Sequence, residues 1–129
     1  MRQPRLLVID DEPALAEFVA QVANDCGFVT TLTSDDGSFR KAVLDERPDM
    51  VALDLGMPGM DGVELLRFLA SEDSRAPVLI ISGFDRRVLE AAFRLGEALG
   101  LKMIGPLEKP VRAEHLEQVL TDVRPGLVE

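Results

Sequence analysis

Residues 51–62 read VALDLGMPGMDG. The apolar part of this stretch ends at Asp54, and a loop with two glycines and a proline follows it. A buried carboxylate is costly unless another group compensates its charge. The ordinary explanation for Asp54 is a strand end that faces water, but the loop that follows favours a functional position. The other strand ends of the chain indicate what lies beside it.

The rest of the chain alternates between short apolar runs and segments with helical spacing. Strand-like runs occupy residues 5–10, 28–33, 49–54, 76–82 and 101–109, and helical patterns occupy residues 13–27, 34–47, 61–72, 85–100 and 111–123. This alternation predicts an α/β fold in which helices cover both faces of a parallel sheet. Pro106 has no N–H to donate to a ladder, so we expect the last strand at an edge of the sheet.

The composition excludes several classes of protein. The net charge is −9, which argues against direct binding of nucleic acid, because phosphate contacts need a basic face. Cys26 is the single cysteine and cannot form an internal disulfide, which indicates a reducing compartment. No apolar run approaches the roughly 20 residues that span a bilayer. We therefore expect a cytoplasmic protein without membrane contacts.

Chemically useful residues follow four of the predicted strands. In open α/β sheets, ligands bind beyond the carboxyl ends of the strands. These ends supply Asp10 and Asp11, then Asp54, Ser82 and Lys109. Carboxylates are ligands that Mg²⁺ prefers, and an aspartate can attack phosphorus to form an aspartyl phosphate. Carboxylates that meet at one sheet edge also repel each other, which predicts that at least one of their pKa values is raised when no cation is bound.

Each of these residues also has an ordinary structural explanation. Asp10 and Asp11 could cap a helix that begins near Pro13. Ser82 could belong to a turn, and Lys109 could be an exposed lysine. Acidic pairs are common in a chain with 23 acids, so this pair gains weight only from its position directly after LLVI.

Four motifs together resemble the receiver domain of bacterial two-component response regulators. They are LLVIDDEP, VALDLGMPGMDG, LIISG and LEKP, in this order along the chain. The resemblance covers about residues 4–123. It implies a receiver domain at residues 1–123, with residues 124–129 as a C-terminal tail or the start of a linker. It also implies a flavodoxin-like, doubly wound sheet of five parallel strands in the order 2-1-3-4-5, flanked by five helices.

The resemblance implies a Mg²⁺-dependent phosphoacceptor. Asp54 would take a phosphoryl group from a sensor histidine kinase or a histidine phosphotransfer protein, without turnover of an external substrate. Asp11, Asp54 and the backbone carbonyl of Gly56 would ligate the Mg²⁺, and Asp10 would support it through water.

Two further residues would hold the phosphoryl group. By the same resemblance, Ser82 would bond a phosphoryl oxygen, and Lys109 would pair with the group. The peptide bond between Lys109 and Pro110 is expected to be cis, a conformation found almost only before proline.

One departure from the family pattern concerns the expected conformational switch. Receivers usually carry Tyr or Phe three residues before the lysine of the fifth strand, where this chain has Pro106. Phe84 is a substitute candidate, although loop packing is the more ordinary explanation for it. The stretch GLKMIGPLEKP also resembles receivers attached to cyclic di-GMP phosphodiesterase domains, so such a domain is one output to consider. A dimer through the fourth helix, fifth strand and fifth helix is another.

Two other functions fit parts of this pattern. A Mg²⁺-dependent phosphatase with an aspartyl-phosphate intermediate would carry a second aspartate at position 56, where this chain has Gly56. A receiver-like interaction domain without phosphotransfer would not need the acids, the hydroxyl and the lysine together.

Overall fold

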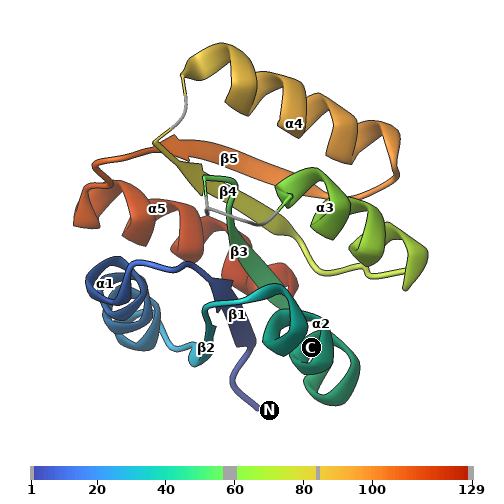
Figure 1. The fold of residues 1–129 in the computed structure, drawn as a ribbon. Coiled ribbons are helices and arrows are strands. Elements are labelled where there is room, and N and C mark those ends of the chain that lie inside the picture. Colours follow the sequence, from blue (N-terminus) through green and yellow to red (C-terminus); the bar gives the residue numbers. More distant parts are fainter. Residues whose placement is uncertain (1, 57–60, 84, 128–129) are drawn as a thin grey trace.

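The computed structural model describes residues 2–56, 61–83 and 85–127 (Figure 1). Its strands are β1 (Arg5–Ile9), β2 (Val29–Thr33), β3 (Met50–Asp54), β4 (Val78–Ser82) and β5 (Met103–Glu108). Its helices are α1 (Pro13–Asp25), α2 (Asp36–Glu46), α3 (Gly62–Ser71), α4 (Arg86–Ala98) and α5 (Ala113–Val123), with a short 3₁₀ helix at Arg124–Gly126. The sheet order is β2-β1-β3-β4-β5 and all neighbouring strands are parallel, which confirms the predicted fold.

The sheet separates two apolar layers. Helices α2, α3 and α4 cover one face, and α1 and α5 cover the other (Figure 1). Side chains alternate between the faces, as the period of a strand requires. In β3, Val51 and Leu53 pack with Phe39 of α2, whereas Met50 and Ala52 join the layer of α1 and α5. Because both faces are covered, every residue of β3 is buried, and its last residue is Asp54.

Three helices begin at aspartates that cap them. Asp35, Asp61 and Asp85 accept hydrogen bonds from backbone N–H groups in the first turns of α2, α3 and α4. Helix α1 differs, because the residue before it is Glu12, whose side chain makes no capping bond. Pro13 occupies the first helical position, where its lack of an N–H does no harm.

Strand β5 lies at the edge of the sheet, as predicted from Pro106. The pairing of β4 with β5 shifts by one residue between Leu79 and Ile81, opposite the Gly105–Pro106 segment. Gly105 has a φ of +88°, a conformation that side chains disfavour, and a Cβ there would lie 2.9 Å from a methyl group of Leu79. The peptide bonds before Pro106 and Pro110 are both cis, so the prediction for the second is confirmed.

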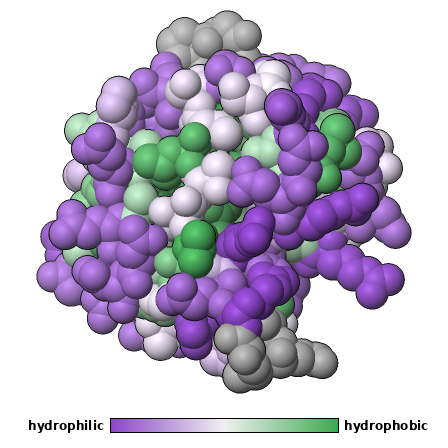
Figure 2. All heavy atoms as spheres, turned by 90° about the horizontal axis from the view of Figure 1, so that it is seen from below, coloured by the Kyte–Doolittle hydropathy of each residue, from purple (hydrophilic) through white to green (hydrophobic). Residues whose placement is uncertain are grey.

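The face of the molecule that is seen from below is mostly hydrophilic (Figure 2). The lower side of the molecule shows only small apolar patches (Figure 2). The large apolar side chains that are more than two-fifths exposed within the described residues are those of Val29, Leu32, Leu44 and Val88. Across residues 2–56, 61–83 and 85–127, every helix is too short or too polar to cross a lipid bilayer.

Candidate functional site

Three polar side chains are buried at the carboxyl edge of the sheet. Asp54 ends β3 and is 3% exposed, Asp10 follows β1 and is 5% exposed, and Ser82 ends β4 and is fully buried. Strand β3 pairs with both β1 and β4, so the three strand tips are neighbours. The parallel topology therefore brings together residues that lie up to 72 positions apart in the sequence.

Lys109 reaches this group from the end of β5. Its backbone N–H donates to the carbonyl oxygen of Ser82 at 3.0 Å, which extends the pairing of β4 and β5 by one bond. Its ammonium Nζ lies 3.1 Å from Oδ2 of Asp54 and 3.9 Å from Oδ2 of Asp10. The other oxygen of Asp54, Oδ1, accepts a hydrogen bond from the backbone N–H of Gly56 at 2.8 Å. Both carboxylate oxygens of Asp54 are thus held.

The structure adds one residue that the sequence pattern did not single out. Oε1 of Glu12 lies 2.6 Å from Nζ of Lys109, and this is the shortest ion pair of that lysine. The sequence holds one signal for it: Glu12 directly follows the acidic pair and precedes Pro13, at a helix start where Ser, Thr, Asp or Asn is usual.

Four carboxylates converge here. Asp10, Asp11, Glu12 and Asp54 each offer an oxygen, and these oxygens all lie within 4.8 Å of one another. Oxygen atoms of carboxylates in such a cluster suit Mg²⁺, and only one ammonium, from Lys109, lies among them in the described part of the chain. The donor set therefore fits the predicted Mg²⁺ ion. The contribution of the Gly56 carbonyl stays a prediction.

Burial and the charges at the site shift two pKa values. Burial raises the pKa of Asp10 to about 6, and the negative charges of Asp54 and Glu12 add to this, against a backbone hydrogen bond and Lys109. The prediction of at least one raised pKa is confirmed, but burial contributes more than repulsion. Burial also lowers the pKa of Lys109, but its hydrogen bonds with Glu12 and Asp54 and the nearby negative charges outweigh this and raise it.

Two further residues, Pro106 and Phe84, concern the expected conformational switch. Pro106 lies in β5 where receivers usually carry an aromatic residue, and it is partly buried. Phe84, the substitute candidate for the switch, lies outside the described residues.

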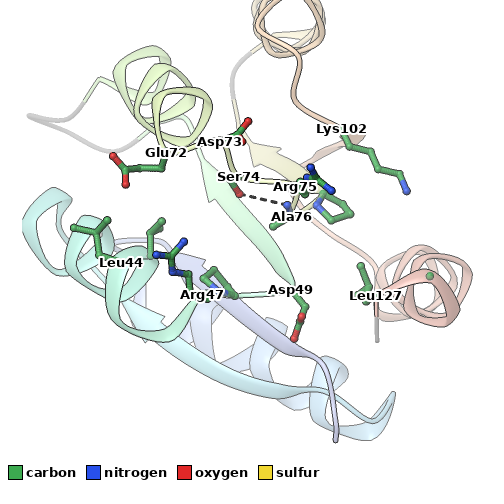
Figure 3. A pocket seen from close by; sticks show the side chains of 14 residues that line it. Leu44, Arg47, Asp49, Glu72, Asp73, Ser74, Arg75, Ala76, Lys102 and Leu127 are labelled. Atoms are coloured by element: carbon green, nitrogen blue, oxygen red, sulfur yellow. Dashed lines mark hydrogen bonds between the residues drawn. The ribbon is translucent and has the colours of Figure 1, made fainter. Parts of the chain in front are cut away.

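A cavity lies at the opposite edge of the sheet from these residues. It has a volume of about 340 Å³ and is bordered by residues that precede β3, β4 and β5, including Asp49, Arg75 and Lys102 (Figure 3). Its lining mixes acidic and basic side chains, and Asp49 is already paired with Arg2 at 2.6 Å. None of the predicted site residues lines it.

The family model for the response regulator receiver domain matches residues 6–121 of the chain. The chain belongs to this family. Members are phosphoacceptor signalling modules of two-component systems, and they interact with histidine kinases and with output domains. The acidic cluster is typical of the metal site of receiver domains.

Similar proteins support this assignment. The receiver is 43% identical over 82 residues to the DNA-binding response regulator MtrA of Mycolicibacterium smegmatis, an alignment that covers 64% of this chain and 35% of MtrA. It is 32% identical over 114 residues to the C4-dicarboxylate transport transcriptional regulatory protein DctD of Pseudomonas aeruginosa, covering 88% of this chain and 24% of DctD. The chain therefore spans about a third or less of these relatives.

A solved structure agrees in fold and extent. The crystal structure of a response regulator from Colwellia psychrerythraea is 30% identical and superposes with a TM-score of 0.84, covering 96% of this chain and 98% of that one.

The buried charge of Asp10 should destabilise the metal-free receiver. The pKa of Asp10 is 3.8 when unfolded and about 6 when folded, so within this window the folded state holds a proton that the unfolded state lacks. Stability should therefore fall as pH rises from 4 to 6 and stay reduced above pH 6. A shift of two units corresponds to about 3 kcal/mol at most, and we expect Asp10→Asn to gain about 1–2 kcal/mol at pH 8.

Urea unfolding in the presence of a chelator measures this gain. It should shrink toward pH 4, where wild-type Asp10 is protonated in the folded state. Asp25→Asn, at the exposed end of α1, removes one charge away from the site and should bring no comparable gain. An Asp10→Asn variant no more stable than wild type at pH 8 would contradict the prediction.

Proposed function

We propose that Asp54 accepts the phosphoryl group that regulates this receiver. The observation that carries the proposal is the position of its carboxylate: it is buried at the tip of the central strand, with one oxygen held by Gly56 and the other by Lys109. A nucleophile held in this way has little freedom to lose when it reacts. The donor would be a sensor histidine kinase or a histidine phosphotransfer protein.

The proposed step needs no acid or base from the receiver when the other ring nitrogen of the donor histidine carries a proton, because the ring then leaves as neutral imidazole. A carboxylate oxygen of Asp54 forms a bond to phosphorus while the bond from phosphorus to the donor imidazole nitrogen breaks. The electron pair stays on that nitrogen, and the product is an aspartyl phosphate. Lys109 is placed to stabilise negative charge on the transferring oxygens. A Mg²⁺ ion bound by Asp10, Asp11 and Asp54 would supply further positive charge at the same oxygens.

Reversal of the modification belongs to the same proposal. Attack of water on the phosphorus would return the carboxylate of Asp54 and release inorganic phosphate. The domain would thus promote only its own phosphorylation and dephosphorylation. A separate phosphatase activity is not favoured, because position 56, where such an enzyme would carry its second aspartate, is Gly56.

Asp54→Asn should abolish labelling by a small phosphodonor. With Mg²⁺ and acetyl phosphate, wild type should gain the mass of one phosphoryl group, and the variant should gain none, because an amide is a poor nucleophile. Intact-mass spectrometry measures both. Asp61→Asn, which changes an exposed cap of α3, serves as the control and should label like wild type. Labelling that persists in Asp54→Asn would refute the assignment.

Ser82 is proposed to carry the signal to the surface. With Pro106 in the place of the usual aromatic residue, a ring that swings inward cannot couple the site to β5. The loop after β4 would move instead, as Ser82 is drawn toward the phosphoryl group and Gly83 absorbs the change of backbone angles. A charge-assisted hydrogen bond of about 1.5–3 kcal/mol supplies part of the few kcal/mol that such a shift needs.

Ser82→Ala should therefore keep phosphorylation but weaken the conformational response. Amide hydrogen exchange with and without a beryllofluoride mimic should show a smaller change over residues 82–100 in this variant. Ser71→Ala, on the exposed face of α3, controls for loss of a hydroxyl elsewhere. Equal changes in wild type and Ser82→Ala would rule out this coupling.

A further part of the proposal concerns the partner or domain that this receiver controls. MtrA is named as a DNA-binding response regulator, and it is much longer than this chain. We propose that this receiver likewise controls an attached or separate output partner. Two predictions about this output remain: a cyclic di-GMP phosphodiesterase domain, and a dimer through α4, β5 and α5. A cytoplasmic location also stays a prediction, as does the absence of direct contacts between this domain and nucleic acid.

A further inference from the structure

The closest partner of Lys109 is not the proposed nucleophile. Its Nζ lies 2.6 Å from Glu12 and 3.1 Å from Asp54. Glu12 belongs to the segment between β1 and α1, and Lys109 follows β5, 97 positions further along the chain. The contact therefore joins the start of α1 to the end of β5.

The side chain of Glu12 serves this contact rather than the helix beside it. Glu12 occupies the N-cap of α1, but only its backbone takes part in starting the helix: its carbonyl oxygen accepts from Ala16 at 3.0 Å. Its own N–H donates to Oδ1 of Asp10 at 2.9 Å, which fixes the backbone next to the site. The carboxylate is thus anchored at its base and directed to the lysine.

An ammonium group has three N–H donors. In the structure these face Glu12 at 2.6 Å, Asp54 at 3.1 Å and, at a longer distance, Asp10 at 3.9 Å. A phosphoryl group arriving at Asp54 needs the same ammonium. Movement of Lys109 toward that group takes it away from Glu12, a carboxylate that no other cation contacts within the described residues.

We propose that Glu12 restrains Lys109 and so limits the rate at which the receiver is phosphorylated. Glu12 acts as a positioning residue, through the lysine, and does not touch the phosphoryl group. This inference rests on the proposed phosphorylation of Asp54 and adds a residue that sets its rate. Glu12 is 60% exposed and Lys109 19%, so a docked donor protein could also displace the carboxylate.

The neighbouring surface supports this last point. Glu12 and Lys109 border a cavity of about 530 Å³ whose other walls include Leu15, Phe18 and Val111. The restraining ion pair therefore stands between the buried acids and an apolar hollow on the surface.

The expected effect is a modest gain in rate. Ion pairs with an exposed partner are weak, so Glu12→Gln should raise the second-order rate constant for phosphorylation by acetyl phosphate about two- to fivefold, or about 0.4–1 kcal/mol. Damage to the fold would lower the rate, so an increase separates the restraint from a merely structural role.

The experiment compares wild type, Glu12→Gln and Glu108→Gln under saturating Mg²⁺ by time-resolved intact mass. Glu108 is exposed and adjoins Lys109 in sequence, and within the described ranges its carboxylate makes no ion pair, so its variant controls for the loss of one charge near the site. Melting temperatures within about a degree of wild type would show that both variants are folded.

The result expected is a faster Glu12→Gln and an unchanged Glu108→Gln. A Glu12→Gln rate equal to or below that of wild type, or an equal gain in Glu108→Gln, would overturn the restraint while leaving the proposed function intact. Folded wild type that takes no phosphoryl group at all would overturn the proposed function and this inference with it.

Discussion

One ammonium group lies in a cluster of four carboxylates at the carboxyl edge of the sheet. Lys109 contacts Glu12, Asp54 and, at 3.9 Å, Asp10, whereas Asp11 completes the acidic cluster without an ion pair to it in the described part of the chain. Burial raises the pKa of Asp10, and the negative charges of Asp54 and Glu12 add to this effect. A site with more carboxylates than ammonium groups favours the binding of a cation, and under the proposed function such a cation would help the site to accept a phosphoryl anion.

The fold brings these charged groups to one place. Parallel strands end at the same edge, so acids from β1 and β3, a hydroxyl from β4 and a lysine beyond β5 meet there. Asp10 and Asp54 are almost fully buried at these strand ends, which strengthens the charge interactions of these two acids. The burial of the strand ends therefore both holds these side chains in place and makes their charges costly.

Much of this could be predicted from the sequence, because an acid at the tip of a buried strand is costly and so indicates a functional position. The positions of Asp10, Asp54, Ser82 and Lys109 at one sheet edge follow from the strand ends at which they lie, whereas the strand order was implied by the resemblance to receiver domains. Glu12 was missed because its importance depends on a contact across 97 positions, and local sequence indicates only that it precedes a helix. The shifted pairing of β5 was also missed: Gly105 and Pro106 predict an edge strand, but not which residues pair across the irregularity.

The central claim, that the acidic cluster is completed by a divalent cation, is tested most directly by the melting temperature during a titration with Mg²⁺ at constant ionic strength. An ion that binds only the folded state raises the stability in proportion to the logarithm of its concentration above its dissociation constant. The account predicts such a rise in wild type and a clearly smaller one in Asp11→Ala, whose exposed side chain contributes little to the fold itself. A melting temperature unchanged by Mg²⁺, or an equal rise in the two proteins, would contradict it.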